Sequence, residues 1–375
     1  MRGNEMRPVV IAAGGTGGHF FPAEALAAEF SRRGQRVVLM TDARSGGLQS
    51  PEFDGRERFV LSGSGIAGRG TLGALRSLAA LAAGTVQARG ILTRLRPSAV
   101  VGFGGYPSVA PVLASRLVAP RPVVVLHEQN GVLGRANRWL AKWADLLALS
   151  LPATTRLPTG LHTEITGNPL RPAIAARAAS PYVPPNDKIH LLVLGGSLGA
   201  RILSDIVPPA LALLTADMRT RLVVTQQCRA EDVDRVRAAY AAAHINATLA
   251  PFFADVAGLL CRAHLVIARA GASTVAELAA VGRPAILVPL PGAIDDHQSA
   301  NATALADAGG AWVMPQADLT PEGLAGKLAS LLVEPNRLTR AATAAAAIGR
   351  PDAAARLADL VEAAINRTAS QESRA

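Results

Sequence analysis

Cysteines, aromatic residues and long apolar runs are scarce in this sequence, and each scarcity excludes a class of protein. Only two cysteines, Cys228 and Cys261, occur in 375 residues, which is too few for a disulfide framework and fits a reducing cytoplasm. Aromatic residues make up 4% of the chain and are not interleaved with basic residues as nucleic-acid binding requires. No stretch of about 20 residues is apolar enough to span a bilayer. We therefore expect a soluble protein with no nucleic-acid partner.

The charge, in contrast, is strongly one-sided. The chain has 38 Lys and Arg residues against 28 Asp and Glu, which gives a net charge of +10. Such an excess suits an anionic partner, for example an acidic membrane surface or a phosphorylated substrate. The Arg-rich and Ala-rich composition of a GC-rich genome explains the same excess, so the charge alone does not decide between the two.

Apolar runs of strand length alternate with segments of helical spacing, and the pattern occurs twice. Continuous apolar strands separated by helices predict parallel sheets covered on both faces, the doubly wound α/β class. In the first half we expect a helix over residues 22–33 and strands at residues 8–13, 36–41, 99–102, 122–127 and 146–149. In the second half we expect strands at residues 189–194, 221–225, 265–268 and 285–289.

Length and composition divide the chain into four segments. A chain of 375 residues predicts two domains. Prolines at 172, 181, 184 and 185 mark residues 172–188 as a linker between domains at 1–171 and 189–349. Residues 350–375 read as an amphipathic helix with a polar tail. Because ligands of doubly wound sheets bind at the carboxyl ends of the strands, two such sheets facing each other would form a cleft.

Three glycine-rich loops each follow an expected strand and precede an expected helix. Residues 14–19 read Gly-Gly-Thr-Gly-Gly-His, residues 195–199 read Gly-Gly-Ser-Leu-Gly, and residues 271–274 read Gly-Ala-Ser-Thr. Glycine lets backbone N–H groups approach an anion closely, and a helix N-terminus adds about half a positive charge. Three such loops predict more than one phosphorylated ligand, although a tight turn alone explains the glycines of any one loop.

His19 closes the first loop and is a candidate general base, because an imidazole titrates near neutrality. A histidine beside a helix start is as often structural. The loop is not a Walker A motif, because no Gly-Lys-Ser/Thr follows it. It also departs from the dinucleotide fingerprint, because Phe20 stands where the third glycine belongs.

The segment around Gly271 has two readings. Gly271 would turn the chain so that the helix start at Ser273 and Thr274 holds a diphosphate, and Glu277 would accept two hydrogen bonds from a ribose diol. A capping box with Thr274 as N-cap and Glu277 at N3 explains the same spacing. A polar run over residues 295–301 follows the next strand and suits sugar hydroxyls, with a polar helix cap as the alternative.

These motifs together resemble the MurG family of glycosyltransferases, and the resemblance covers nearly the whole chain. It rests on residues 14–19 with Pro22 and Ala23, 102–108, 127–130 with Asn137 and Arg138, 167–171, 195–199, 270–277 and 296–301. The resemblance implies the GT-B fold, in which two Rossmann-like domains face each other across the active cleft. In that fold the terminal helix commonly returns to the N-terminal domain.

The resemblance also implies the binding sites. The C-terminal domain would bind UDP-N-acetylglucosamine (UDP-GlcNAc), with Glu277 on the ribose and Gln298 and Asn301 on the sugar. The expected donor-binding residues are Thr16, Gly17, Gly18, Asn130, Arg171, Ser197, Phe253, Ala272, Ser273, Thr274, Val275, Ala276, Glu277, Gln298 and Asn301. The expected acceptor-binding residues are Gly14, Gly15, His19, Gly104, Gly105 and Tyr106.

The implied reaction is an inverting transfer of GlcNAc to the muramoyl 4-hydroxyl of undecaprenyl-diphospho-MurNAc-pentapeptide (lipid I). The product, lipid II, serves peptidoglycan synthesis and hence cell shape and division. The expected catalytic residues are His19 as the base, Arg171 and Glu277. Family members bind the donor without a metal, so no metal and no other cofactor is expected.

A lipid acceptor implies a peripheral protein on the cytoplasmic face of the cell membrane, with partners in cell-wall synthesis complexes. The segment from Arg69 to Arg96 has an apolar centre over residues 72–83 and flanking arginines. Apolar surface rimmed by arginine suits contact with an anionic membrane surface. An ordinary core-facing helix is the alternative.

Four other functions remain open from the residues. The nearest is a GT-B transferase with a different lipid or natural-product acceptor, and the next is a nucleotide-sugar epimerase on the same fold. An NAD-dependent enzyme is suggested by Asp42 near the end of the second strand and disfavoured by Phe20. A pure binding protein would need neither a base nor a leaving-group site.

Overall fold

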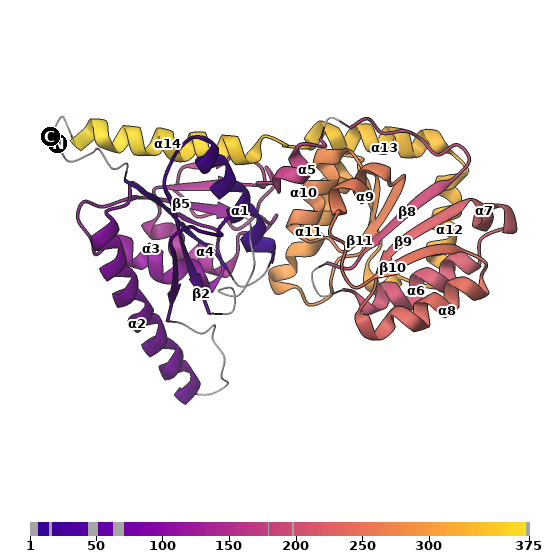
Figure 1. The fold of residues 1–375 in the computed structure, drawn as a ribbon, viewed down its shortest axis with the longest axis horizontal. Coiled ribbons are helices and arrows are strands. Elements are labelled where there is room, and N and C mark those ends of the chain that lie inside the picture. Colours follow the sequence, from indigo (N-terminus) through magenta and orange to yellow (C-terminus); the bar gives the residue numbers. More distant parts are fainter. Residues whose placement is uncertain are drawn as a thin grey trace. The chain divides into compact units, whose positions relative to one another are not determined.

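The computed structural model describes residues 7–14, 17–43, 52–62, 71–178, 180–196 and 199–372 (Figure 1). The chain divides into two compact units. One unit is formed by Met1–Pro172 together with Asp352–Ala375, and the other by Ala173–Pro351.

The first unit is built on a seven-stranded sheet in which all neighbouring strands are parallel. The strand order is β3-β2-β1-β4-β5-β6-β7, and Val9 of β1 lies opposite Val37 of β2 and Ala99 of β4. The strands are β1 (Val9–Ala12), β2 (Val37–Asp42), β3 (Arg58–Leu61), β4 (Ala99–Gly102), β5 (Val123–Glu128), β6 (Leu146–Leu149) and β7 (Thr163–Ile165).

The second unit repeats this plan with a six-stranded parallel sheet of order β10-β9-β8-β11-β12-β13. Leu191 of β8 lies opposite Val224 of β9 and Leu265 of β11. The strands are β8 (Ile189–Leu194), β9 (Leu222–Gln227), β10 (Asn246–Ala250), β11 (Leu265–Ala268), β12 (Ala285–Leu287) and β13 (Ala311–Val313).

Helices lie between successive strands and after the last one. Those of the first unit are α1 (Gly17–Arg32), α2 (Thr71–Leu95), η1 (Tyr106–Ser108), α3 (Val109–Ser115), α4 (Arg135–Leu140), η2 (Ala141–Trp143) and α14 (Ala353–Glu372). The passage to the second unit contains α5 (Pro172–Ala175). The second unit has α6 (Arg201–Ala212), α7 (Ala216–Arg221), η3 (Ala230–Asp232), α8 (Val233–Ala242), α9 (Val256–Arg262), α10 (Ala272–Val281), η4 (Ile294–Asp296), α11 (His297–Asp307), η5 (Gln316–Asp318), α12 (Pro321–Leu332) and α13 (Pro335–Ile348).

Both faces of the first sheet are covered. Because successive strand residues point to opposite faces, Val9 and Ile11 pack under α1 and α14, whereas Val10 packs under α2 and α3. The terminal helix α14 packs against α1 in the same unit (Figure 1). Leu357 and Val361 of α14 belong to the core that they share. Arg33, just after α1, adds hydrogen bonds of 2.6 Å to Asp359 and 2.8 Å to Glu362.

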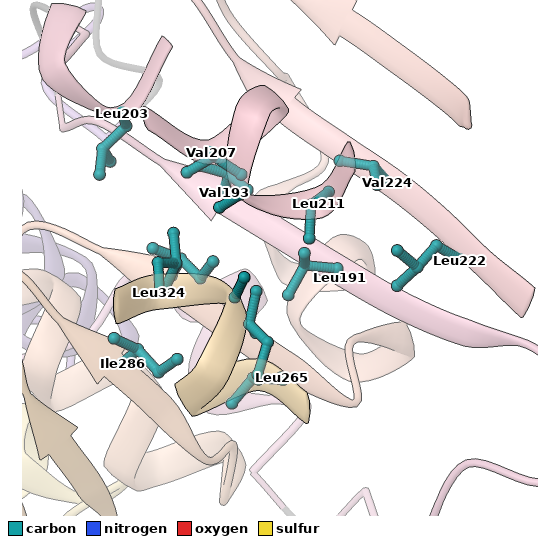
Figure 2. Close-up of a cluster of buried hydrophobic side chains, with 14 of the residues drawn as sticks. Leu191, Val193, Leu203, Val207, Leu211, Leu222, Val224, Leu265, Ile286 and Leu324 are labelled. Atoms are coloured by element: carbon teal, nitrogen blue, oxygen red, sulfur yellow. The ribbon is translucent and has the colours of Figure 1, made fainter. Parts of the chain in front are cut away.

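The core of the second unit is mostly aliphatic, as the composition requires. Leu203, Val207 and Leu211 on one stripe of α6 pack against Leu191 and Val193 of β8 (Figure 2). The helices α8 and α12 complete the cover of this face through side chains that include Val236, Tyr240, Leu324 and Leu328.

The strand order places the carboxyl-end loops of functional interest. In each sheet the order reverses direction beside the first strand of the unit, between β1 and β4 and between β8 and β11. Ligands of open α/β sheets bind at the carboxyl side of such a switch point. The strands that flank these two places, β1, β4, β8 and β11, are each followed in the sequence by a glycine-rich segment.

The predicted fold class is confirmed, and one predicted helix start is wrong. The helix expected from residue 22 begins at Gly17, so Gly17, Gly18 and His19 form the first turn of α1. Glycine is a poor helix former and proline favours a first turn, which is why the sequence suggested the later start. Pro22 instead lies inside the helix.

Candidate active site

His19 is held at the start of α1 by groups from two other loops of the first unit. Its Nδ1 lies 2.8 Å from the carbonyl oxygen of Phe103, after β4, and 3.2 Å from Oε1 of Gln129, after β5. The other edge of the ring faces Gly105, where an added Cβ would lie 3.6 Å from Nε2. The structure thus brings together His19 and the Gly104-Gly105 loop, both predicted on the acceptor side.

Gln129 continues this contact into the core. Its Nε2 donates to the carbonyl oxygen of Phe103 at 2.9 Å and lies 3.3 Å from Nδ1 of His127. The Nε2 of His127 lies 3.0 Å from the carbonyl oxygen of Gly167. Burial lowers the pKa of His127 to about 4, so this ring is neutral at physiological pH. Sequence reasoning gave neither residue a role of its own.

Glu128 organises the loop that carries Asn130. Its Oε1 accepts hydrogen bonds from the backbone N–H and from Nδ2 of Asn130, both at 3.0 Å. Its Oε2 accepts from the N–H of Gly134 and from Nδ2 of Asn137, both at 2.9 Å. The buried carboxylate therefore has four donors and serves to shape the loop.

The Gly104-Gly105 loop requires glycine at both positions. Gly104 and Gly105 have φ values of 76° and 69°, which L side chains rarely adopt. A Cβ on Gly104 would also lie 3.1 Å from Nδ2 of Asn137. The next residue, Tyr106, has a buried hydroxyl with no hydrogen-bond partner in the described part of the chain, and burial raises its pKa.

Arg171 lies close to the start of α1. Its guanidinium carbon is 5.2 Å from the ring centroid of Phe21, a cation–π contact. Phe21 in turn packs on Gly17, where a Cβ would lie 2.9 Å from the ring. The first turn of α1 contains no acidic residue. A helix N-terminus and a nearby arginine therefore combine to favour an anion.

The neighbouring Asn168 is 4% exposed, and neither of its amide atoms has a hydrogen-bond partner among the described residues. The sequence placed this residue in a motif but assigned it no role.

In the second unit, the structure excludes one of the two readings of the segment around Gly271. Gly271 is the N-cap of α10, so Thr274 occupies N3 and Glu277 lies in the second turn. The capping-box alternative is therefore wrong, because Thr274 is not at the cap. Ala272, Ser273 and Thr274 form the first turn, and the hydroxyl of Ser273 is buried without a partner in the described residues. Val275, Ala276 and Glu277 follow on the same helix.

Arg269 is a charged residue for which sequence reasoning proposed no role. It lies between β11 and α10, is 9% exposed, and donates to the carbonyl oxygens of Val288 and Pro289 and to Oε1 of Gln316. Burial lowers its pKa, and no carboxylate in the described residues pairs with it. Arg269 stands two positions before Gly271, the N-cap of α10. The only sequence signal was its place at a strand end.

The two amides expected on the sugar differ in their surroundings. Asn301 is fully buried in α11, and its Nδ2 donates to the carbonyl oxygen of Ala270 at 3.1 Å. It therefore holds the loop before α10. Gln298 is half-buried, and its Oε1 accepts the N–H of Leu290 at 3.0 Å. Asp295 and Asp296, before α11, both have positive φ, at 56° and 54°.

The loop after β8 is linked to the loop after β10. Oε1 of Gln227 accepts the N–H of Gly195 at 3.2 Å, and its Nε2 donates to the carbonyl oxygen of Pro251 at 3.2 Å. Phe253 lies half-buried two residues further on.

Gly14 is buried at the end of β1, whereas the predicted site residues Gly15, Thr16 and Ser197 lie outside the described residues.

Two properties of the described residues bear on the chemistry. No group of three or more His, Cys, Asp or Glu side chains there is arranged to hold a metal ion. No helix in that same part of the chain has the length and apolar character needed to cross a bilayer. Phe20, at the position of the third fingerprint glycine, is buried in the core of the first unit, which argues against the dinucleotide alternative.

Comparisons with known proteins agree with this arrangement. The sequence matches the glycosyltransferase family 28 N-terminal domain over residues 9–148 and the C-terminal domain of that family over residues 190–357. A relative from Granulibacter bethesdensis, 62% identical over 97% of this chain and 96% of its own length, is named UDP-N-acetylglucosamine--N-acetylmuramyl-(pentapeptide) pyrophosphoryl-undecaprenol N-acetylglucosamine transferase. A relative from Acidiphilium cryptum with the same name is 56% identical over 97% of this chain and 99% of its own.

Solved structures give the same answer. The crystal structure of MurG from Acinetobacter baumannii superposes with a TM-score of 0.77 at 32% identity, covering 95% of this chain and 99% of that one. The glycine-rich switch-point loops, the sequence relatives and this structural match are consistent with one another. The chain belongs to glycosyltransferase family 28 and, within it, to the MurG family.

Proposed function

We propose that this enzyme transfers GlcNAc from UDP-GlcNAc to the muramoyl 4-hydroxyl of lipid I and so forms lipid II for peptidoglycan synthesis. The observation that carries the proposal is a chain 62% identical, over 97% of its length, to a relative that is named for this transfer. The glycine-rich loops at both switch points support it, because the reaction uses two diphosphate substrates.

The donor diphosphate would bind at the N-terminus of α10. Three features favour an anion there: the free N–H groups of the first turn, the unpartnered hydroxyl of Ser273 and the uncompensated charge of Arg269. Glu277, on the second turn, would accept hydrogen bonds from the ribose hydroxyls. Fixed positive groups of this kind stabilise UDP as negative charge grows on it, which is the work that a metal ion does in other transferases.

The transfer itself would be a single displacement. The acceptor oxygen forms a bond to C1 of GlcNAc as the bond from C1 to the UDP oxygen breaks, and the configuration at C1 inverts. The hydroxyl proton goes to Nε2 of His19, and UDP leaves with the electron pair of the broken bond. Arg171, beside the start of α1, would stabilise the negative charge that grows on the diphosphate of UDP.

The lipid acceptor also needs a membrane contact, for which α2 is the best candidate in the described residues. Leu75, Leu78 and Val86 on this helix are each more than 60% exposed, at 63%, 64% and 70%. The helix contains Arg76, Arg89 and Arg94 and no acidic residue. Its other side, through Ala88 and Leu92, is in the core, as the core-facing alternative expected. The enzyme would bind an anionic membrane face peripherally through α2.

The direct test is transfer of radiolabelled GlcNAc to a short-chain lipid I analogue in the presence of EDTA. The proposal predicts a labelled product that is absent when the acceptor lacks its muramoyl 4-hydroxyl. A wild-type enzyme that binds UDP but labels no lipid I analogue would move the acceptor assignment to another lipid or glycoside. A product that forms only with added divalent metal would contradict the metal-independent donor site.

A further inference from the structure

The hydrogen bonds around His19 have one consistent assignment of donors and acceptors. The carbonyl oxygen of Phe103 can only accept, and two nitrogens approach it: Nδ1 of His19 at 2.8 Å and Nε2 of Gln129 at 2.9 Å. Nδ1 of His19 must therefore carry a hydrogen. The amide of Gln129 must have its nitrogen toward Phe103, which leaves its oxygen toward Nδ1 of His19, at 3.2 Å.

His127 fixes the same amide from the other side. Its Nε2 faces the carbonyl oxygen of Gly167 at 3.0 Å, so this nitrogen carries the hydrogen. The ring is fully buried and its pKa is about 4, so it is neutral at physiological pH and Nδ1 keeps its lone pair. That lone pair accepts from Nε2 of Gln129 at 3.3 Å. A flipped amide would place oxygen against both the Phe103 carbonyl and this lone pair.

In the neutral form of His19, Nε2 is therefore the nitrogen without a hydrogen. This nitrogen faces Gly105, which has no side chain and a φ of 69°. An acceptor hydroxyl at that loop would meet a lone pair. When Nε2 takes the proton, the Nδ1–H bonds to Gln129 and Phe103 become charge-assisted and strengthen, whereas neutral His127 adds no opposing charge.

We propose that Gln129, hydrogen-bonded between His19 and His127, is a positioning residue that holds His19 with Nε2 free and steadies the imidazolium formed on proton transfer. This inference rests on the proposed role of His19 as the base. Gln129 touches no reacting atom in this account and acts only through His19.

The kinetic test is a double-mutant cycle of Gln129→Met and His19→Ala, assayed with a short-chain lipid I analogue. Methionine has a similar length but neither amide group. Gln129→Met should lower kcat about 10-fold, as the loss of one hydrogen bond to a charged group implies, with the KM for UDP-GlcNAc unchanged. In the His19→Ala background the same substitution should have no further effect. Gln35→Met is the matched control, because Gln35 donates to Arg7 in the same unit but lies before β2, at the other end of the sheet.

A second readout does not depend on activity. In enzyme labelled with ¹⁵N-histidine, the resonances lost in His19→Ala identify the ring, and wild type should show a protonated Nδ1 and an unprotonated Nε2. Gln129→Met should speed exchange of the Nδ1 proton with water several-fold, and Gln35→Met should not. Protonated Nε2 in wild type, or an equal kcat loss in both backgrounds of the cycle, would overturn the inference. The predicted resonances in an enzyme that fails to make lipid II would instead refute the proposed function.

Discussion

Glu277 is the residue on which the donor side of the account depends. Its place in the second turn of α10 excludes the capping role, and in the proposed function it binds the ribose hydroxyls. Glu277→Ala should raise the Kd for UDP at least about 10-fold, because even one hydrogen bond to a charged group contributes about 1.5–3 kcal/mol. Calorimetry with UDP measures this. Glu334→Ala, at an exposed position in the same unit, is the control, and equal Kd values for the two variants would contradict the assignment.

His19 is the corresponding residue on the acceptor side. General-base catalysis is worth about 10²- to 10⁴-fold, so His19→Ala should lower kcat by at least about 100-fold. The KM for UDP-GlcNAc should change less than about twofold, because the base does not contact the nucleotide. Steady-state kinetics decide this, and a variant that keeps most of its kcat would rule out His19 as the base.

His127 makes the stability of the first unit depend on pH. The unfolded ring titrates near 6.5 and the buried ring near 4, so below pH 6.5 the unfolded state binds a proton that the folded state does not. Stability is therefore lost as pH falls from 6.5 toward 4, by about 2 kcal/mol at pH 5 relative to pH 8. In a Trp312→Phe background, Trp139 and Trp143 report unfolding of the first unit by fluorescence.

Adding His127→Gln to that background should remove most of this pH dependence. A pH dependence that is the same with and without His127 would show that other groups cause it.

The residue scale is also where sequence reasoning succeeded least. His19, Gly105 and Glu277 could be selected because they stand in glycine-rich or polar motifs at strand ends. The role of Gln129 could not be predicted, because its hydrogen-bond partners are distant in the sequence: His19 is 110 residues away and Phe103 is 26 residues away. The role of Arg269 could not be predicted either, because it donates hydrogen bonds to carbonyl groups about 20 residues further along the chain.

At the scale of elements, α2 carries the proposed membrane contact. Replacing Leu75 and Leu78 together with Glu should weaken binding to anionic vesicles at least 10-fold, because each exposed leucine contributes about 1.5–3 kcal/mol when it leaves water. The KM for a long-chain lipid acceptor should rise, and that for a short-chain acceptor should not. Vesicle co-sedimentation measures the binding.

The matched control for α2 is Leu213→Glu, because Leu213 is a similarly exposed leucine in the second unit, at 56%. If Leu213→Glu weakened vesicle binding as much as the double replacement, the contact would not be specific to α2.

The strands show which elements can be found from sequence. Nine expected strands are present, and the four that were missed, β3, β7, β10 and β13, are the edge strands of the two sheets. A central strand of a doubly wound sheet is buried on both faces and reads as a continuous apolar run. An edge strand is partly exposed: Thr163–Ile165 has no buried residue, and Asn246–Ala250 likewise has none. Such segments do not produce that run.

At the scale of the whole molecule, the two-sheet α/β class followed from the repeated alternation of apolar runs and helical segments. The return of α14 to the first unit is explained by its own residues. One stripe of α14, through Leu357, Ala358, Val361 and Ala364, fills the core beside α1, and Arg33 adds two charged contacts. The periodicity predicted the helix. Its return to the first unit was implied only by the family resemblance, and its contacts with Arg33, more than 300 positions earlier, were not predicted.

The central claim is a one-step inverting transfer to the muramoyl 4-hydroxyl. The measurement that tests it most directly is the linkage and anomeric configuration of the product, determined by nuclear magnetic resonance on the disaccharide released from the lipid. The α-linked donor sugar should appear as a β-1,4-linked GlcNAc. An α linkage would require two displacements or a different mechanism, and a linkage to any other hydroxyl would contradict the assigned acceptor.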